Sequence, residues 1–357
     1  MDAVASAAQD PAASYVSCPM CLSRLAWGEL SLWRWDGGEG RYLRLELPAD
    51  ASPEQVIRER RMASVRCPDP GQTMGEHYLP ADYGYYGAPV VLGFIGTTRS
   101  GKSHLLTAMV GAIERGDLAD YGVRRRPVDH AMHQKFLDDR VRPLLNDARV
   151  LAPTQEGVVN FVDAFIIGQP DGPQRPVALF DVAGGELTSV HGAKQFLEVA
   201  DGLIFVVDPT QFDTGRLGDE TFNTVLDLLQ SSGRLPGRVS AAVVLNKADL
   251  VRFEDPITRW LRYETREIDP DLILRESADV YAYLHRHGAQ AWTRPYRECA
   301  RATLHVASAT GGAGPQGGGA GGVYPRGVTP RRVLAPLIAL LAMTGVLTGQ
   351  QAQQVGI

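Results

Sequence analysis

The 357-residue sequence lacks an excess of positive charge and has few cysteines, and each shortage excludes a class of protein. Only four of its 36 basic residues are lysines (102, 135, 194 and 247), and 41 acidic residues give a net charge of −5. An acidic balance without a basic patch is not that of a nucleic-acid-binding surface. Four cysteines in a chain of this length do not make a disulfide framework. The composition instead fits a soluble protein with a large core and more than one domain.

We also expect no signal peptide at the N-terminus, because MDAVASAAQDPAAS has no basic start and no long apolar core. We therefore expect residues 1–14 to be disordered and the protein to be cytoplasmic. One apolar run, residues 333–349, reaches the short limit for a membrane span but contains Pro336 and Gly345. We expect a buried helix there rather than a membrane helix, because the α/β pattern described next needs a final helix.

Two patterns divide the rest of the chain. Residues 15–82 contain a Cys-x-x-Cys pair and a segment that alternates around an Asp-Gly-Gly turn, which predicts a β-hairpin in a small β domain. Between residues 88 and 349, apolar runs alternate with helical patterns, which predicts an α/β domain whose mostly parallel sheet has helices on both faces. The expected strands are 90–96, 158–168, 176–184, 202–208, 240–247 and 302–308. The glycine-rich residues 311–328 are expected to form a long flexible loop before the last helix.

The first expected strand is followed by G-T-T-R-S-G-K-S, a complete match to the phosphate-binding loop pattern G-x-x-x-x-G-K-[ST]. A strand before it and a helix after it are the context that the motif requires. Its amides would hold phosphates, Lys102 would reach the β- and γ-phosphates, and Ser103 would bind Mg²⁺. The predicted phosphate-contacting residues are Gly96, Thr97, Thr98, Arg99, Ser100, Gly101, Lys102, Ser103 and His104.

A second motif, Asp181-Val-Ala-Gly184, ends the strand at residues 176–184. The aspartate can hold Mg²⁺ through a water molecule, and the Gly184 amide can contact the γ-phosphate. Such a motif is weak alone but strong after a phosphate-binding loop and a buried strand. Ligands of this architecture bind at the carboxyl ends of the strands, where both motifs lie.

Two further motifs select the base. In Asn246-Lys247-x-Asp249, the aspartate can accept hydrogen bonds from the guanine N1–H and exocyclic amine, a donor pair that adenine lacks. The Lys247 stem would cover the ring, and Asn246 would brace the pocket. After the last strand, the backbone of residues 308–310 could hydrogen-bond guanine O6. These contacts would come from Ser308, Ala309 and Thr310. The four motifs in this order predict a GTP-binding domain.

Over residues 88–349 the chain resembles the translation-factor-related (TRAFAC) class of P-loop GTPases. The cysteine-containing head, the long insert before the switch region and the last helix, PRRVLAPLIALLA, are similar to the bacterial double-GTPase type. This resemblance implies Mg²⁺-dependent hydrolysis of GTP to GDP and a switch function. It also implies a protein partner, either a second GTPase or an effector, in a predicted bacterial conflict or signalling system.

The switch elements depart from the usual pattern. The insert carries one threonine, Thr154, whose position fits a Mg²⁺ ligand but equally fits a plain loop residue. Gly185 stands where Ras-like enzymes place the glutamine that orients the attacking water. Arg99 and His191 are the candidate catalytic residues beside Lys102, although each could be an ordinary loop residue. We expect slow hydrolysis that a partner or dimerisation stimulates, or, as the alternative, a GTP-bound sensor or scaffold with little turnover.

The head offers a candidate zinc site. Cys18 and Cys21 form a Cys-x-x-Cys pair, and Cys67 supplies a third thiolate. His77 is the best fourth candidate, with Asp69 behind it. The alternative is a degenerate ribbon that folds without metal. A zinc ribbon leaves open an RNA-associated GTPase, which the acidic composition disfavours. A zinc ion with four protein ligands would be structural.

Overall fold

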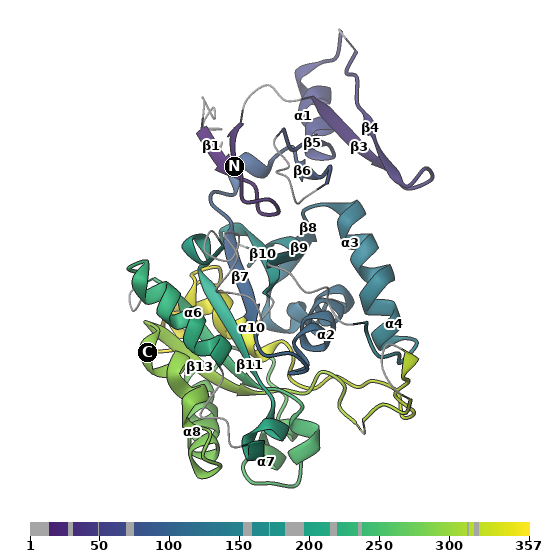
Figure 1. Ribbon diagram of the computed structural model, residues 1–357. Coiled ribbons are helices and arrows are strands. Elements are labelled where there is room, and N and C mark those ends of the chain that lie inside the picture. Colours follow the sequence, from purple (N-terminus) through teal and green to yellow (C-terminus); the bar gives the residue numbers. More distant parts are fainter. Residues whose placement is uncertain are drawn as a thin grey trace, which may run out of the picture.

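The computed structural model describes most of the chain. The described residues are 14–27, 31–48, 50–68, 75–152, 159–170, 172–182, 196–214, 220–234, 238–312, 314–317 and 321–357. They form an N-terminal region with two small antiparallel sheets, followed by an α/β domain built on a seven-stranded sheet. Figure 1 shows the N-terminal region above the α/β domain, with β7 leading from one into the other.

The N-terminal region consists of short strands and one helix. β1 and β2 pair antiparallel, and a second sheet has the order β4-β3-β5-β6. The bounds are β1 Ser14–Ser17, β2 Arg24–Trp27, β3 Leu32–Asp36, β4 Arg41–Arg44, α1 Pro53–Arg61, β5 Ser64–Arg66 and β6 Tyr78–Pro80. Between β3 and β4, Asp36 Oδ1 accepts the Gly38 N–H at 2.8 Å, the local bond typical of an aspartate turn. The expected hairpin is therefore confirmed.

The large sheet has the order β13-β12-β11-β7-β10-β9-β8. Every pair from β13 to β10 is parallel, whereas β9 pairs antiparallel with both β10 and β8. The bounds are β7 Val90–Ile95, β8 Arg124–Pro127, β9 Val159–Gly168, β10 Gln174–Val182, β11 Gly202–Val207, β12 Ser240–Leu245 and β13 Arg301–Val306. β7, β11 and β12 are buried along their whole length, as expected for parallel strands with both faces covered. The predicted mostly parallel α/β fold is confirmed.

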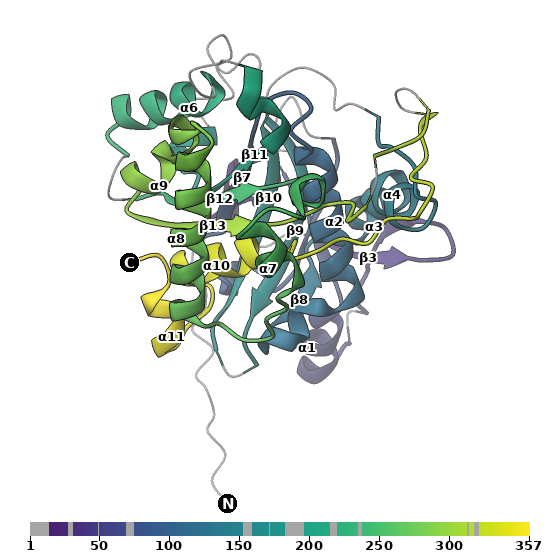
Figure 2. The same ribbon diagram turned by 90° about the horizontal axis from the view of Figure 1, so that it is seen from below.

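Helices cover both faces of this sheet, and Figure 2 shows the strands in the middle of the molecule with helices around them. One hydrophobic cluster joins α2 and α10 to one face, and a second joins α6 and α8 to the other. The second cluster continues into Cys18, Leu25 and Val65 of the N-terminal region. The helix bounds are α2 Lys102–Arg115, α3 His130–Phe136, α4 Arg142–Leu145, α6 Glu220–Ser231, α7 Ile257–Arg262, α8 Pro270–Arg286, α9 Arg294–Glu298, α10 Ala335–Met343 and α11 Gln350–Gln354.

The apolar run near the C-terminus forms α10, whose residues from Pro336 to Met343 are all buried. It packs against β12 and β13 within the α/β domain, which confirms the expected buried helix. Among the described residues, no helix has the length and apolar character needed to cross a bilayer.

The long insert before the switch region contains α3, a π-helical turn at Leu137–Val141, and α4. Asp129 caps α3, because its carboxylate accepts the N–H groups of Ala131 and Met132 at 2.8 and 3.1 Å. The helical insert thus begins at a defined cap.

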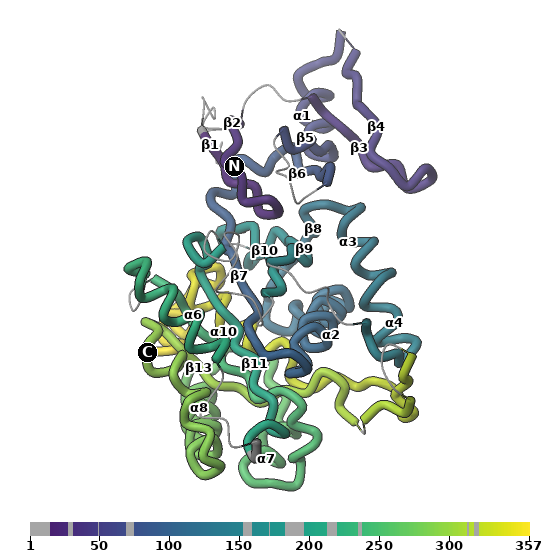
Figure 3. The backbone as a smooth tube through the Cα atoms, viewed as in Figure 1, coloured from purple at the N-terminus to yellow at the C-terminus, as the bar shows by residue number. Residues whose placement is uncertain are grey.

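The glycine-rich segment, residues 311–328, reaches this insert. Figure 3 traces it from the end of β13 across to α4. The Val150 N–H donates to Gly322 O, and the Tyr324 N–H donates to Ala148 O, both at 2.8 Å. Tyr324 also joins a small apolar cluster with Leu144 and Leu151. The segment therefore links the loop after β13 to the chain that precedes residue 153.

Candidate nucleotide-binding site and metal cluster

The phosphate-loop sequence connects β7 to α2. Gly101 has φ 82° and stands directly before the first residue of α2. A Cβ atom at Gly101 would lie 2.6 Å from Asn246 Nδ2, so only glycine fits there. At Gly96 a Cβ atom would lie 2.8 Å from Ser100 Oγ. Neighbouring side chains thus lie close against the backbone of both glycines, as expected in a phosphate-binding loop.

The side chains of the loop divide into an outer and an inner set. Thr98 and Arg99 are exposed, and Arg99 has φ 69°. Ser100 is buried, and its N–H donates to Thr97 O at 3.1 Å. Arg99 therefore lies at the rim of the loop, where a second chain could reach it.

The two predicted magnesium ligands on β10 and α2 meet at the loop. Because β10 pairs parallel with β7, its end brings Asp181 beside the start of α2. Ser103 Oγ donates to Asp181 Oδ2 at 3.1 Å, and Lys102 Nζ lies 2.7 Å from Asp181 Oδ1. Lys102 Nζ also donates to the Val182 carbonyl. These groups suit a phosphate with its Mg²⁺. The hydroxyl and carboxylate oxygens can bind Mg²⁺, and the ammonium can pair with phosphate.

The base-selecting motif follows β12, which is separated from β7 by β11, and it braces the phosphate loop from there. Asn246 Nδ2 donates to Ser100 O at 3.1 Å. Lys247 has φ 51°, and its Nζ donates to Arg99 O at 2.6 Å. Two consecutive side chains after β12 thus hold the backbone of the phosphate loop.

Asp249 meets the loop that follows β13. Ser308 Oγ donates to Asp249 Oδ1, and the Gly311 N–H donates to Ser308 Oγ at 2.8 Å. Ala309 is buried, and Thr310 O accepts the Thr329 N–H at 2.8 Å. The structure therefore brings together the carboxylate and the loop that sequence analysis assigned to guanine.

One participant was missed from the sequence. Asp208, directly after β11, is 3% exposed, and its Oδ2 accepts from Lys247 Nζ at 2.6 Å. Its position at the carboxyl end of a buried parallel strand was the available signal, since ligands of such sheets bind there.

His104 contacts two other segments. Its Nε2 accepts the Leu151 N–H at 3.4 Å, and its ring meets that of Tyr324 edge-on with centroids 6.2 Å apart. Burial, with the charges of Lys247 and Arg140, lowers the His104 pKa to about 4. The imidazole is thus a neutral acceptor near the insert and the glycine-rich segment, and its backbone remains the part predicted to contact phosphate.

Three predicted residues, Thr154, Gly184 and His191, lie outside the described residues. Their assigned roles in binding Mg²⁺, contacting the γ-phosphate and catalysis stay predictions. Gly185 and Asp69 lie outside the described residues as well.

The four predicted zinc ligands come together in the N-terminal region. The ligand atoms of Cys18, Cys21, Cys67 and His77 all lie within 4.8 Å of one another. Cys18 Sγ lies 3.2 Å from His77 Nε2, and Cys21 Sγ lies 3.9 Å from Cys67 Sγ. His77 Nδ1 donates to Gly75 O at 2.8 Å, which leaves Nε2 facing the thiols. Three sulfurs and an imidazole nitrogen oriented in this way could hold a zinc ion.

Two turns position this cluster. In the first, Leu22 has φ 61°, and the Cys18 N–H donates to Ser23 O at 2.9 Å. In the second, the Cys67 N–H donates to His77 O at 3.0 Å, beside the β5–β6 pairing. Backbone bonds therefore hold the two halves of the cluster in register.

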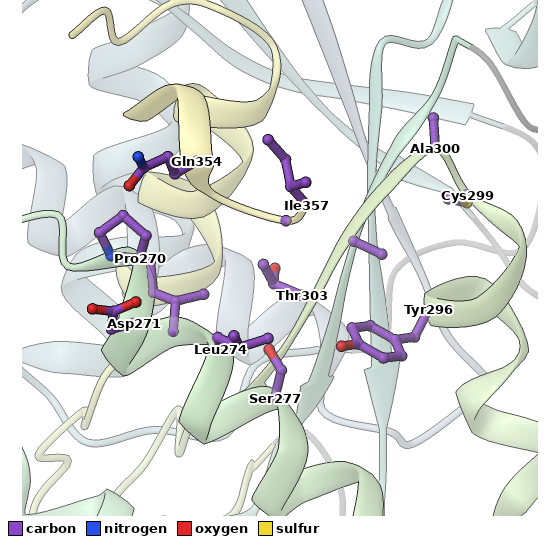
Figure 4. Close-up of a pocket in the computed structure, with 13 residues that line it drawn as sticks. Pro270, Asp271, Leu274, Ser277, Tyr296, Cys299, Ala300, Thr303, Gln354 and Ile357 are labelled. Carbon is purple, nitrogen blue, oxygen red and sulfur yellow. The ribbon is translucent and has the colours of Figure 1, made fainter. Parts of the chain in front are cut away.

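A cavity of about 480 Å³ lies away from both sites, between α8, α9 and the C-terminal residues. Figure 4 shows Ser277, Tyr296 and Thr303 along its wall, next to Ile357. None of its lining residues belongs to the four motifs. This cavity is therefore separate from the candidate nucleotide site, which the converging loops at the strand ends form.

This convergence on one sheet edge defines a P-loop GTPase domain, and a family comparison gives the same result. The model of the family Double-GTPase 2 matches residues 90–289, more than half of the chain. The chain belongs to the Double-GTPase 2 family, a family of GTP-binding proteins, which confirms the resemblance drawn from the sequence. The matched residues include the first three motifs, but neither the loop after β13 nor the Cys/His cluster.

Two solved structures are also similar to parts of this chain. One is a bacterial selenocysteine-specific elongation factor, EF-Sec, with 17% identity and a TM-score of 0.30 over 62% of this chain and 25% of that chain. Another is the ADP-ribosylation-factor-like protein SAR1, a small COPII coat GTPase from Encephalitozoon cuniculi in complex with GDP. It has 15% identity and a TM-score of 0.29 over 62% of this chain and 70% of that chain. The chain thus spans only a quarter of the elongation factor. No curated protein sequence matches significantly.

Proposed function

We propose that this protein is a slow, Mg²⁺-dependent GTPase that works as a molecular switch in the bacterial cytoplasm with a partner GTPase or effector. The observation that carries the proposal is the meeting of four loops at one sheet edge. Lys102 pairs there with Asp181, while Lys247 holds the phosphate loop and Ser308 bonds to Asp249. Membership of a GTP-binding family supports this reading.

The phosphate end of the site would work through Lys102, Ser103 and Asp181. The Lys102 ammonium would exchange its contact with Asp181 for the β- and γ-phosphates, which frees the carboxylate to act with Ser103 toward Mg²⁺. Bound Mg²⁺ would neutralise charge that develops on the phosphates. Thr154 and the Gly184 amide would complete this end of the site.

The base end would work through Asp249. Its carboxylate is 6% exposed and lies beside Ser308, so it presents a desolvated acceptor pair to the guanine N1–H and amine. Adenine offers no matching donors and would leave this buried carboxylate without that donor pair. The site therefore favours GTP over ATP.

Hydrolysis is proposed to be slow because Gly185 replaces the water-orienting glutamine of Ras-like enzymes. Arg99, exposed at the rim of the loop, and His191 are the residues proposed to assist catalysis. Stimulation would come from a second molecule that orders the switch segments or supplies the missing group. The glycine at position 185 also favours a second candidate function, a GTP-bound sensor or scaffold with little turnover.

Turnover across a concentration series distinguishes these functions. We expect single-turnover GTP hydrolysis with Mg²⁺ to be slow at low protein concentration and to accelerate as the concentration rises. Lys102→Ala should abolish it. Tight binding without hydrolysis at any concentration would favour the sensor or scaffold. Fast hydrolysis by dilute monomer that survives Arg99→Ala and His191→Ala would rule out the proposed catalytic arrangement.

We also propose that Cys18, Cys21, Cys67 and His77 hold one structural Zn²⁺. The support is the donor set, the mutual distances and the orientation of His77 by Gly75. Four protein ligands leave no position for substrate, so the ion would stabilise the N-terminal region rather than catalyse a reaction.

A further inference from the structure

Asp208 lies between the phosphate loop and the base-selecting motif of the candidate nucleotide site, but it belongs to none of the four motifs. It follows β11, the strand between β7 with its phosphate loop and β12 with its base-selecting motif. The carboxylate is 3% exposed, so its charge needs a partner within the protein. That partner is Lys247, at 2.6 Å.

Local bonds fix the direction of the carboxylate. Asp208 Oδ1 accepts the Thr210 N–H at 2.9 Å and the Thr210 hydroxyl at 2.7 Å, which leaves Oδ2 turned toward Lys247. The same turn contacts the phosphate loop, because Thr97 Oγ1 donates to Gln211 Oε1 at 3.3 Å. Asp208 is therefore a fixed anchor and not a mobile counter-ion.

Lys247 is held at both ends. Its backbone is in the left-handed region, and its ammonium bridges Asp208 and Arg99 O, each at 2.6 Å. Between these ends, the stem runs against the phosphate loop. A Cβ atom at Gly101 would lie 3.4 Å from Lys247 Cε and 3.7 Å from Cγ. The stem is thus stretched along the loop that would carry the nucleotide.

We infer that Asp208 is a positioning residue for the guanine nucleotide: it holds the Lys247 ammonium so that the lysine stem stays over the base and braces the phosphate loop. The inference rests on the proposed function, since it concerns the same site. The Lys247 side chain is 30% exposed. Without Asp208, its ammonium would keep one described protein acceptor, Arg99 O, and would turn toward water.

The test is a double-mutant cycle on the rate of GDP dissociation, measured by displacement of fluorescent GDP from the full chain. Asp208→Ala and Lys247→Ala should each speed dissociation by roughly ten-fold, the effect expected for losing a buried charge-assisted bond. The double variant should be no faster than Lys247→Ala alone, because Asp208 acts through that lysine. Asp208→Asn, which keeps the volume and removes the charge, should behave like Asp208→Ala.

Asp201→Asn is the matched control. Asp201 stands before the opposite end of β11, where its Oδ2 accepts the Val91 N–H at 2.9 Å, away from the motifs. It should leave the dissociation rate unchanged. Additive effects of Asp208→Ala and Lys247→Ala, or equal acceleration by Asp201→Asn, would overturn the inference while the proposed function stands. If the wild-type chain fails to bind GDP, the proposed function fails and this inference fails with it.

Discussion

The metal cluster and the nucleotide site are both polar and partly buried, but they balance their charges differently. In the nucleotide site, each of two lysines pairs with a carboxylate, Lys102 with Asp181 and Lys247 with Asp208. The metal cluster brings together three thiols and one imidazole. Thiolates so close together repel one another unless a cation binds between them. The nucleotide site can therefore hold its shape through its own ion pairs, whereas the Cys/His cluster would be balanced by the proposed zinc ion.

The two regions also differ in what surrounds them. The nucleotide site stands at the edge of a seven-stranded sheet with a large hydrophobic cluster on each face. In the described part of the N-terminal region, the strands are three to five residues long, and the helix α1 has no buried residue. A region so small would gain much of its stability from the proposed zinc ion.

The largest expected effect is on the metal cluster. Cys67→Ser should abolish zinc binding and unfold the N-terminal region, because structural zinc contributes on the order of 10 kcal/mol to folding. Zinc analysis and limited proteolysis of the purified protein would measure both results. Cys299→Ser is the matched control, since Cys299 is a buried cysteine in the α/β domain. Full zinc content and an unchanged cleavage pattern in Cys67→Ser would show that the region folds without metal.

The next effect concerns the base. Asp249→Asn should weaken guanine-nucleotide binding by a factor of about 10⁴, because the amide cannot accept both donor hydrogens. The amide N–H can instead donate to the C2 oxygen of xanthine, so xanthosine diphosphate should bind better to the variant than to the wild type. Competition binding with GDP and xanthosine diphosphate checks both changes. Unaltered preference for GDP would show that Asp249 does not contact the base.

A smaller effect is expected where the two regions meet. Asp129 Oδ2 accepts the Tyr78 N–H at 2.7 Å, next to His77, and Oδ1 lies 3.3 Å from the hydroxyl of Tyr42. The Tyr42 and Tyr78 rings stack with centroids 3.8 Å apart. The cap of α3 thus joins the metal-cluster region to the insert.

Asp129→Ala should lower the free energy of unfolding by about 2 kcal/mol, since it removes a helix cap and a buried hydrogen bond together. Asp269→Ala removes only the cap of α8, where Asp269 accepts the Leu272 N–H at 3.0 Å, and should cost about 1 kcal/mol. Chemical denaturation of both variants gives the comparison. Equal losses would mean that the Tyr78 contact adds no stability.

The smallest effect is pH-dependent. The His104 pKa is about 4 in the folded protein and ordinarily 6.5, so between these values the unfolded chain binds a proton that the folded chain does not. Its contribution to stability is therefore complete above pH 6.5 and is lost as the pH falls toward 4. Between pH 7.5 and 6, wild type should lose on the order of 1 kcal/mol more than His104→Gln. Parallel pH dependence in urea denaturation of the two proteins would contradict this assignment.

The contrast between the two regions also separates what the sequence could predict from what it could not. The phosphate loop was recognisable because contiguous residues with fixed spacing perform one task. Asp181, Asn246 and Ser308 stand at or just after the ends of apolar strands. His77 was identified as the best remaining ligand after three cysteines. These local patterns predicted both the α/β fold and the grouping of the side chains.

Features that depend on packing between distant segments escaped prediction. Asp208 carries no motif, and its importance rests on the side chain of Lys247, 39 residues away. The Asp129–Tyr78 contact spans 51 residues and two regions. The antiparallel pairing of β9 with β10 had one available signal: the expected strands 158–168 and 176–184 are separated by too few residues for a parallel crossover.

The central claim is that the loops at the sheet edge bind a guanine nucleotide. Calorimetric titration of GDP and ADP into the purified protein with Mg²⁺, beside Lys102→Ala, tests it most directly. We expect one GDP per chain, no detectable ADP binding, and loss of GDP binding in the variant. Absence of GDP binding, or equal affinity for ADP and GDP, would contradict it.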